Sequence, residues 1–305
     1  MKLRKTAAVA VAVLALTATA CGGKEGSAGD KKAQKPGESG APQLPTYTVA
    51  KDVALDSPTF KEAKKRGKLV IGSKADQPYL GFEDQSTKKR SGFDVEIAKM
   101  IAADLGFTAD QIEWKTVDSG VRETAISKGQ VDYYVGTYTI NDKRKKQVGF
   151  AGPYYLAGAD LLVRKDETAI TGKDAVKGKK VCSIKGSTPL EEISKPEYGA
   201  KTTELAKYSD CVQQLLTKQV DAVTTDDAIL KGYAADNPTK LKVIGSPFTK
   251  EPYGIGMDKD DKALRDAIND SLDKHIKDGT YKKIYDATLG LSASEYKAPP
   301  ALERY

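Results

Sequence analysis

The sequence predicts an α/β protein with two α/β units in tandem, each built around a sheet that is rich in parallel strands. Short runs of β-branched and aromatic residues alternate with segments whose apolar residues recur at helical spacing, and this order is typical of strands joined by covering helices. This alternation of strands and helices occurs twice in succession along the chain. About 235 residues remain when both ends are set aside, which allows one large domain or two lobes.

The first unit begins with the apolar segment "KLVIGSK" (68–74), which is predicted to be a buried strand. The next segment, "GFDVEIAKMIAADLGF" (92–107), is predicted to be a helix, because its aliphatic residues fall on one face and a glycine can end it. The remaining elements of this unit are a strand at 111–118, a helix at 122–129 and a strand at 130–139. This β-α-β-α-β order predicts a mostly parallel sheet.

The second unit repeats the alternation after a gap. Its predicted elements are a strand at 179–186, a helix at 189–194, a strand at 201–209, a helix at 210–219, a strand at 221–226 and a helix at 227–236. The segment 259–290 then has an amphipathic helical pattern that needs an apolar surface to cover, and it could return to the first unit. The last residues, 292–305, show no pattern and are expected to form a flexible tail.

The N-terminus is predicted to be a targeting segment. Three basic residues are followed by an apolar run at 7–16, which is shorter than the roughly 18 to 20 residues of a membrane span. Small residues then lead to Cys21, which resembles a lipoprotein signal with cleavage before the cysteine and a palmitate-bearing lipid on its thiol. The alternative is an ordinary secretory signal that leaves a free cysteine. The following Gly-, Pro-, Ser- and Lys-rich segment is expected to be a flexible tether.

Two further cysteines, Cys182 and Cys211, form an even pair in a chain predicted to be exported, where disulfides persist. A metal site is not expected, because His275 is the single histidine. The formal net charge is +7, of which the signal segment contributes +3. Acidic and basic residues are interleaved along the rest of the chain, so no nucleic-acid partner is indicated.

Several segments in order resemble a known family. They are "GFDVEIA", "RETAISKGQVD", "TYTINDKRKKQVGFAGPYY", "GKKVCSIKGSTP" and "VDAVTTDDAIL". Together they resemble the extracytoplasmic amino-acid-binding proteins of ABC importers, and above all the lipid-anchored glutamate-binding members. The resemblance covers about residues 57 to 291 and implies a periplasmic-binding-protein fold, in which two hinge strands join two lobes that close on the ligand.

The resemblance also implies where the parts of the chain begin and end. The expected parts are a signal peptide (1–20), a lipid-anchored tether (21–56), lobe one (57–157 plus 251–291), lobe two (158–250) and a tail (292–305). The hinge strands are expected near 156–160 and 248–253. The lipid anchor would place the protein at the extracellular face of the cytoplasmic membrane.

An α-amino acid carries a carboxylate and an ammonium, and a site that buries it must pair both charges. Arg144 offers a planar guanidinium that suits a carboxylate, and Asn141 begins the helix that carries it. The resemblance adds further donors for the α-carboxylate, which are Thr139, the main chain at Thr137, Ser187 and Thr188. The alternative is that Asn141 only caps a helix on which Arg144 is a solvated charge.

Asp226, at the end of a predicted strand, matches the carboxylate that pairs the ligand's ammonium in the family. It could instead simply cap the following helix, as aspartate often does. The segment around Thr188 also has an ordinary explanation, because Thr188 and Glu191 fit a capping box at a helix start. For these positions the family resemblance favours the ligand role.

Three residues match the positions that hold the ligand's side chain in glutamate-binding relatives, namely Arg122, Ser119 and Lys74. Two cations suit a side-chain carboxylate better than an uncharged amide, so the resemblance favours glutamate or aspartate over glutamine. Arg122 and Lys74 could instead be surface charges. Tyr79 and Phe93 are expected to wall the aliphatic part of the ligand, although an aromatic residue there could equally belong to the core.

The resemblance therefore implies a monomeric receptor that binds glutamate and delivers it to the membrane subunits of an ABC permease, with an intracellular ATPase behind them. It implies no catalytic residue, cofactor or metal. One alternative is a dehydratase-like enzyme on the same fold, which would need a general acid or base such as Glu83 or Glu123 near the cleft. The other alternative is a sensor domain that binds the same ligand.

Overall fold

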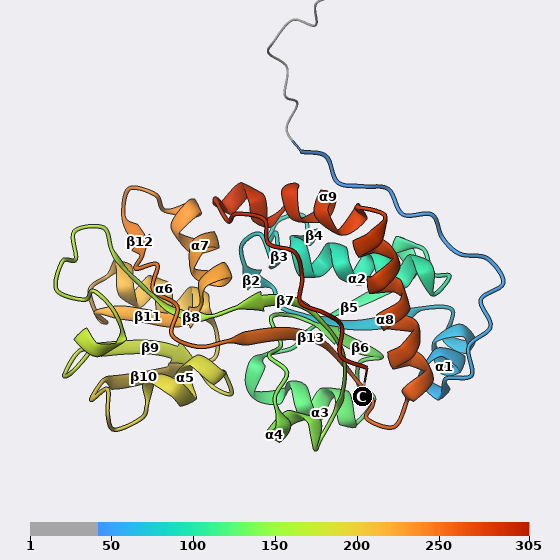
Figure 1. Ribbon diagram of the computed structural model, residues 1–305, viewed down its shortest axis with the longest axis horizontal. Coiled ribbons are helices and arrows are strands. Elements are labelled where there is room, and N and C mark those ends of the chain that lie inside the picture. Colours follow the sequence, from blue (N-terminus) through green and yellow to red (C-terminus); the bar gives the residue numbers. More distant parts are fainter. Residues whose placement is uncertain (1–41, 305) are drawn as a thin grey trace, which may run out of the picture. The chain divides into compact units, whose positions relative to one another are not determined.

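The computed structural model describes residues 42–304, so the predicted signal peptide and Cys21 lie outside the described residues. Within residues 42–304 the chain forms two five-stranded sheets and one small three-stranded sheet. Each five-stranded sheet has helices packed on it, which gives the α/β fold with two lobes that the sequence predicts (Figure 1). We call the lobe that comes first in the chain the first lobe and the other the second lobe.

The sheet of the first lobe consists of β1 (Leu69–Ser73), β5 (Ile112–Thr116), β6 (Tyr133–Val135), β7 (Gly149–Ala157) and β13 (Glu251–Met257). Its strand order is β5–β1–β6–β13–β7. Strand β1 is parallel to β5 and β6, whereas β13 is antiparallel to β6 and β7. The parallel strands are those that the β-α-β-α-β alternation predicts, and the antiparallel strands connect the two lobes.

The helices of the first lobe are α1 (Pro58–Arg66), α2 (Phe93–Asp104), α3 (Arg122–Ser127), α4 (Asp142–Lys145), α8 (Lys262–Lys277) and α9 (Thr280–Asp286). The C-terminal helices α8 and α9 thus return to the first lobe, where both pack on α2. Asp104 at the end of α2 accepts hydrogen bonds from Ser271 and Lys274 of α8, each at 2.7 Å. This part of the chain covers the apolar surface that its amphipathic pattern requires.

Helix α2 is buried on nearly all sides, although the sequence predicts a single apolar face. The sheet covers one side, α8 and α9 cover a second, and the segment before α1 covers a third. In that segment the Tyr47 hydroxyl donates to Glu96 at 2.8 Å, and the Ala50 amide donates to the Ala103 carbonyl at 2.9 Å. Residues 47–50, which the sequence places in the tether, therefore lie against the first lobe.

The second lobe contains β8 (Ala159–Arg164), β9 (Lys180–Ile184), β10 (Lys201–Leu205), β11 (Ala222–Asp226) and β12 (Leu241–Val243), in the sheet order β10–β9–β11–β8–β12. Strands β10, β9 and β11 are parallel, β8 is antiparallel to β11, and β12 is antiparallel to β8. The helices are α5 (Thr188–Ile193), α6 (Tyr208–Leu216) and α7 (Asp227–Asp236).

Two stretches of chain cross between the lobes, and Figure 1 shows them side by side at β7 and β13. The first crossing runs from β7 into β8 through Gly158, where an added Cβ would lie 2.7 Å from the Thr249 carbonyl. The second runs from β12 into β13, and there the Phe248 amide donates to the Ala159 carbonyl at 2.8 Å. The first crossing lies within the expected segment 156–160, whereas the second begins after Val243 and only overlaps the expected segment 248–253.

Short elements complete the fold. The small sheet contains β2 (Asp76–Gln77), β3 (Gly81–Glu83) and β4 (Arg90–Ser91), and the 3-10 turns are η1 (Ala109–Gln111), η2 (Ser119–Val121), η3 (Lys173–Ala175) and η4 (Leu289–Ser292). After η4 the chain has no helix or strand up to residue 304, yet Tyr296 packs on Tyr285 with ring centres 5.1 Å apart. None of the helices in residues 42–304 is both long and apolar enough to cross a membrane.

Candidate functional site

Arg144 is buried between the lobes, with 5% of its surface exposed, so the interpretation as a solvated surface charge is wrong. Asn141 begins α4 and accepts a hydrogen bond from the Arg144 amide at 2.9 Å, which fixes the turn that directs the side chain. The guanidinium donates to the Thr139 carbonyl at 2.7 Å and to the Gly186 carbonyl of the second lobe at 3.0 Å. Arg144 thus joins the two lobes.

A second guanidinium, that of Arg122, lies beside the first and is 2% exposed. It also donates to the Gly186 carbonyl, at 3.1 Å. Both guanidiniums face the ring of Tyr138, at 4.3 Å for Arg122 and 5.0 Å for Arg144. Glu123 offsets part of this positive charge, because it lies 3.3 Å from Arg144 and accepts from the Tyr138 hydroxyl at 2.9 Å. Burial and the Arg122 charge lower the pKa of Arg144 to about 10.

The structure brings the three residues expected to hold a ligand side chain together. Lys74, at the end of β1, is 2% exposed and donates to the Ser119 hydroxyl at 2.8 Å. Burial, with the nearby Arg122 charge, lowers the pKa of Lys74 to about 7. The Nε of Arg122 is buried and has no hydrogen-bond partner in residues 42–304. Neither Lys74 nor Arg122 is therefore a surface charge, and the Arg122 Nε lacks a hydrogen-bond acceptor among the described residues.

Asp226 supplies an acidic group in the second lobe, at the junction of β11 and α7. Its carboxylate is 3% exposed and accepts from the Tyr253 hydroxyl at 2.7 Å through Oδ2. The other oxygen, Oδ1, is buried without a partner among the described residues, and the side chain makes no helix-capping bond. Burial and repulsion from Glu251 raise the pKa of Asp226 well above its usual value. The Arg122 charge acts in the opposite direction on this pKa, but no lysine, arginine or histidine in residues 42–304 forms an ion pair with Asp226.

The other residues expected to bind the α-carboxylate already have partners inside the protein. The Thr137 amide, in a left-handed turn after β6, donates to Asp94 at 3.0 Å. The Ser187 hydroxyl donates to the Ile184 carbonyl at 2.8 Å and accepts from the Leu190 amide at 3.2 Å. Ser187, and not Thr188, therefore caps α5, which corrects the capping box expected at Thr188.

The hydroxyls of Thr139 and Thr188 are likewise engaged, by a residue that sequence reasoning missed. Both donate to Oε2 of Glu251, at 2.7 and 2.6 Å. Glu251 is the first residue of β13, and its carboxylate is 3% exposed. One signal was present in the sequence, since an acidic residue opens an apolar strand inside the segment expected to be a hinge.

The two aromatic residues expected to wall the ligand are not brought to the guanidiniums. Phe93 lies in the core of the first lobe, edge-on to Tyr281 and Tyr285 at 5.5 and 5.8 Å between ring centres, which is the alternative that the sequence leaves open. Tyr79 borders a separate pocket together with Leu44 and Phe82. The aromatic ring that does lie at the site is Tyr138, beneath the two arginines.

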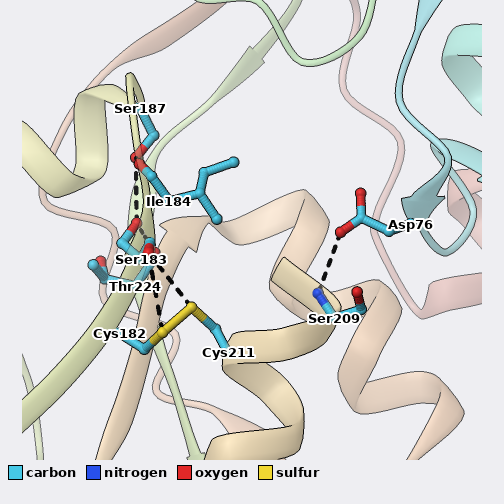
Figure 2. Close-up of a disulfide and its surroundings, with 8 residues drawn as sticks. All are labelled: Asp76, Cys182, Ser183, Ile184, Ser187, Ser209, Cys211 and Thr224. Carbon is cyan, nitrogen blue, oxygen red and sulfur yellow. Dashed lines mark hydrogen bonds between the residues drawn. A yellow bond between two sulfur atoms is a disulfide. The ribbon is translucent and has the colours of Figure 1, made fainter. Parts of the chain in front are cut away.

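The predicted disulfide between Cys182 and Cys211 is formed, and it fastens α6 to β9 (Figure 2). Ser183, next to Cys182, lies 3.2 Å from the Ser187 hydroxyl and donates to the Thr224 carbonyl at 2.8 Å. On the other side of the bond, the Ser209 amide near the start of α6 donates to Asp76 of the first lobe at 3.2 Å (Figure 2). The disulfide thus holds together two parts of the second lobe, one that contacts Ser187 and one that contacts Asp76 of the first lobe.

The two lobes are in contact around Arg144 and Gly186. A cavity of about 210 Å³ is bordered by Ser119, Glu123 and Arg144 of the first lobe and by Gly186 of the second. At its edge the Lys143 ammonium pairs with Glu191 across the lobes at 2.7 Å. Arg144 and Glu123 of the first lobe line this cavity together with Glu191 of the second, whereas Arg122 and Asp226 are buried outside its lining.

Comparisons with known proteins agree with this geometry. The family model described as "Bacterial extracellular solute-binding proteins, family 3" matches residues 69–290. The glutamate-binding protein GluB of Corynebacterium efficiens is 37% identical over 95% of this chain and 92% of its own length. The glutamine-binding protein GlnH of Bacillus subtilis is 38% identical over 74% of this chain and 83% of its own.

A solved structure, that of the ancestral amino acid-binding protein AncCDT-1, a precursor of cyclohexadienyl dehydratase, is similar with a TM-score of 0.69. It is 30% identical and covers 76% of this chain, whereas the match covers 99% of that structure. The relatives and this structure span both lobes of the fold described here.

Proposed function

The chain belongs to family 3 of the bacterial extracellular solute-binding proteins, and on this premise we propose that it binds glutamate, or a closely related polar amino acid, between its lobes. It then delivers the ligand to an ABC-type permease and catalyses no reaction itself. This proposal takes the ligand class from the names of the relatives, which include a glutamate-binding and a glutamine-binding protein.

The observation that carries the proposal is the buried carboxylate of Asp226 in the second lobe, which has one oxygen without a partner among the described residues, while two buried guanidiniums come from the first lobe. Asp226 of the second lobe is a buried carboxylate with one oxygen unbonded, and no cation lies against it within residues 42–304. Burying such a charge is costly unless a positive group arrives to pair it. The ammonium of an α-amino acid is such a group, and its α-carboxylate would meet Arg144 on the other side.

The proposed partners of the α-carboxylate remain Thr139, Thr188, Thr137 and Ser187. The Thr137 amide and the Ser187 hydroxyl are bonded within the protein and would have to exchange these bonds for the ligand. Because the hydroxyls of Thr139 and Thr188 are taken by Glu251, we expect these residues to contribute through their main-chain amides. The amides at the start of α5 add to the positive potential there.

The ligand's side chain is proposed to lie against Lys74, Ser119 and Arg122. These residues offer two cationic groups and an unpaired Nε, and the acidic residues that act on Lys74 are Asp76, Asp118 and Glu123. A side-chain carboxylate satisfies this environment better than a carboxamide does, because an uncharged amide leaves the positive charge under-compensated. Glutamate is therefore proposed to bind more tightly than glutamine.

The proposed cellular context rests on the N-terminal sequence and on the family. Cleavage before Cys21 and lipid attachment would hold a monomeric receptor at the outer face of the cytoplasmic membrane, on the tether that follows. The permease subunits would receive the closed receptor. Neither a cofactor nor a nucleic-acid partner is proposed.

Calorimetric titration of the mature chain with the twenty common amino acids tests the proposal. We expect one site, with the highest affinity for glutamate and a lower affinity for glutamine. The variant Arg144→Ala should bind none of them, whereas the control Lys146→Ala, an exposed charge on the same short segment, should bind as the parent does. If no amino acid binds, or if a cationic amino acid binds most tightly, the proposed function is wrong.

The variant Arg122→Ala tests the side-chain pocket separately. It should retain binding of α-amino acids but reduce glutamate's advantage over glutamine, because Arg122 is proposed to face only the side chain. An unchanged preference for glutamate in this variant would refute the assignment of the pocket while leaving the receptor function intact.

A further inference from the structure

Glu251 occupies a position where both lobes and a crossing strand meet. Its Oε2 accepts hydrogen bonds from Thr139 of the first lobe at 2.7 Å and from Thr188 of the second lobe at 2.6 Å. Its Oε1 accepts from Thr249, in the crossing itself, at 2.7 Å. The carboxylate is almost fully buried, and no lysine, arginine or histidine within residues 42–304 forms an ion pair with it, although the Arg144 charge is near enough to interact with it. Three hydroxyls therefore solvate this charge in place of water.

This cluster exists only while the lobes are together. Thr139 lies between β6 and α4 of the first lobe, whereas Thr188 is the first residue of α5 in the second lobe. Their hydroxyl oxygens lie 3.4 Å apart, and one oxygen of Glu251 accepts from both. A hinge motion that separates the lobes moves Thr188 away from Thr139, so Glu251 must lose one of the two bonds and take up water instead.

A buried carboxylate depends strongly on such bonds. Hydrogen bonds to a charged acceptor contribute more than neutral ones, and a buried acceptor that loses a donor without gaining water is costly. Opening the cleft exchanges the Thr188 bond for hydration, and closing it reverses the exchange. The free energy of this exchange contributes to the equilibrium between the open and closed forms, both with and without a bound ligand.

We propose that Glu251 is a positioning residue for lobe closure, which sets the closed fraction of the ligand-free protein and the lifetime of the closed complex without selecting the ligand's side chain. The effect on ligand lifetime rests on the proposed function, but the effect on the ligand-free protein does not. Glu251 acts through Thr188, because Thr188 is its partner on the opposite lobe.

The test measures closure directly. The mature chain with Cys21→Ser carries two dyes, on cysteines introduced at the exposed positions Lys128 of the first lobe and Lys201 of the second. Single-molecule energy transfer then gives the closed fraction without ligand. Glu251→Ala and Thr188→Val should each lower that fraction about tenfold. The double variant should lower it no further than Glu251→Ala alone, because both changes remove the same bond.

A second readout separates positioning from ligand contact. Dissociation rates of glutamate and glutamine should rise by the same factor in both variants, so that the ratio between the two ligands is unchanged. An unaltered closed fraction, or a changed ratio between the ligands, would overturn the proposal. If Glu251→Ala does not fold, Thr188→Val decides alone, since this hydroxyl-to-methyl change keeps the shape of the side chain.

The two proposals fail in distinguishable ways. If no amino acid binds the protein but the variants still shift the ligand-free closed fraction, the proposed function is wrong and the closure role of Glu251 stands. If amino acids bind and the variants leave the closed fraction unchanged, the proposed function stands and the closure role of Glu251 is wrong.

Discussion

At the scale of single residues, Asp226 shows how an unsatisfied group points to a ligand. Tyr253 bonds one oxygen of the carboxylate, and the other is buried without a partner in the described part of the chain. Most buried polar groups in native proteins are hydrogen-bonded, so an exception calls for an explanation. The ligand ammonium that we propose to bind here would supply the missing partner.

The variant Asp226→Asn should therefore bind every α-amino acid far more weakly. Removing one partner of a buried charge pair costs about 3 kcal/mol or more, which is about a hundredfold in affinity. The ligand-free variant should unfold at the same temperature as the parent or a higher one, because a buried charge has been removed. Calorimetry and thermal unfolding measure the two effects. Unchanged affinity would contradict the ammonium assignment.

Lys74 predicts a pH dependence that differs between ligands. Its pKa is lowered to about 7 by burial and by Arg122, while Asp76, Asp118 and Glu123 act in the opposite direction. A ligand carboxylate beside Lys74 favours its charged form and raises its pKa, so glutamate binding takes up a proton above pH 7. The affinity for glutamate should thus fall about tenfold per pH unit above 7 and level off below it.

Glutamine provides the control for this prediction, because it carries the same ammonium and α-carboxylate. Any titration of Asp226 changes the affinities for both ligands by the same factor. The ratio of the two affinities therefore reports the pH dependence that Lys74 alone contributes. The glutamate-to-glutamine ratio should rise as the pH falls from 9 to 7, and Lys74→Met should make it independent of pH. A constant ratio in the parent protein would mean that Lys74 does not meet the side chain.

At the scale of elements, the turn between β9 and α5 limits how closely the lobes approach. Gly186 lies in this turn with φ near +76°, and an added Cβ would lie 2.9 Å from both the Gly120 Cα and the Ser119 carbonyl of the first lobe. The absence of a side chain here brings the Gly186 carbonyl within reach of both arginines. Closure and the charge cluster depend on the same glycine.

Gly186→Ala should hold the lobes apart and weaken binding of all amino acids by at least about tenfold, because a Cβ–backbone distance of 2.9 Å cannot persist. The matched control is Gly178→Ala, which has a φ of +74° but nothing within 4 Å of the added Cβ. Both variants carry the same backbone strain. We expect both variants to lose a similar amount of stability, and only Gly186→Ala to lose affinity for amino acids. Equal affinities of the two variants would show that the contact at Gly186 does not limit closure.

The sequence predicted most elements well where a strand or helix has one clear period. It was less successful where tertiary contacts override the local pattern. The predicted strand 130–139 is a strand only over Tyr133–Val135, because Thr137 adopts a left-handed turn that directs its amide to Asp94. The periodicity of α2 predicts one buried face, and the structure buries nearly all of it beneath distant segments.

The charged residues of the site were more predictable than its neutral ones. Arg144, Arg122, Lys74 and Asp226 are all buried at the border of the lobes, since charges in a closed cleft must serve one another or a ligand. Sequence reasoning could not foresee that Glu251 would take the threonine hydroxyls, because that cluster joins segments more than sixty residues apart. Phe93 was assigned to the ligand for its position in a motif, although its ring belongs to the core.

At the scale of the whole molecule, the two lobes each supply half of a charge pair. The guanidiniums of Arg144 and Arg122 come from the first lobe and the carboxylate of Asp226 from the second, and all three are buried. We expect the two crossings to let the lobes open and close around them. A small dipolar ligand that pairs both groups would stabilise the closed form, and at a hundred times its dissociation constant it would add about 2.7 kcal/mol to the free energy of unfolding.

The most direct test of this account is a crystal structure of the mature chain grown with excess L-glutamate. The account predicts one glutamate in the cleft, with its ammonium within hydrogen-bond distance of Asp226 and its α-carboxylate bonded to Arg144. A closed, empty cleft, or a glutamate bound away from both residues, would contradict it.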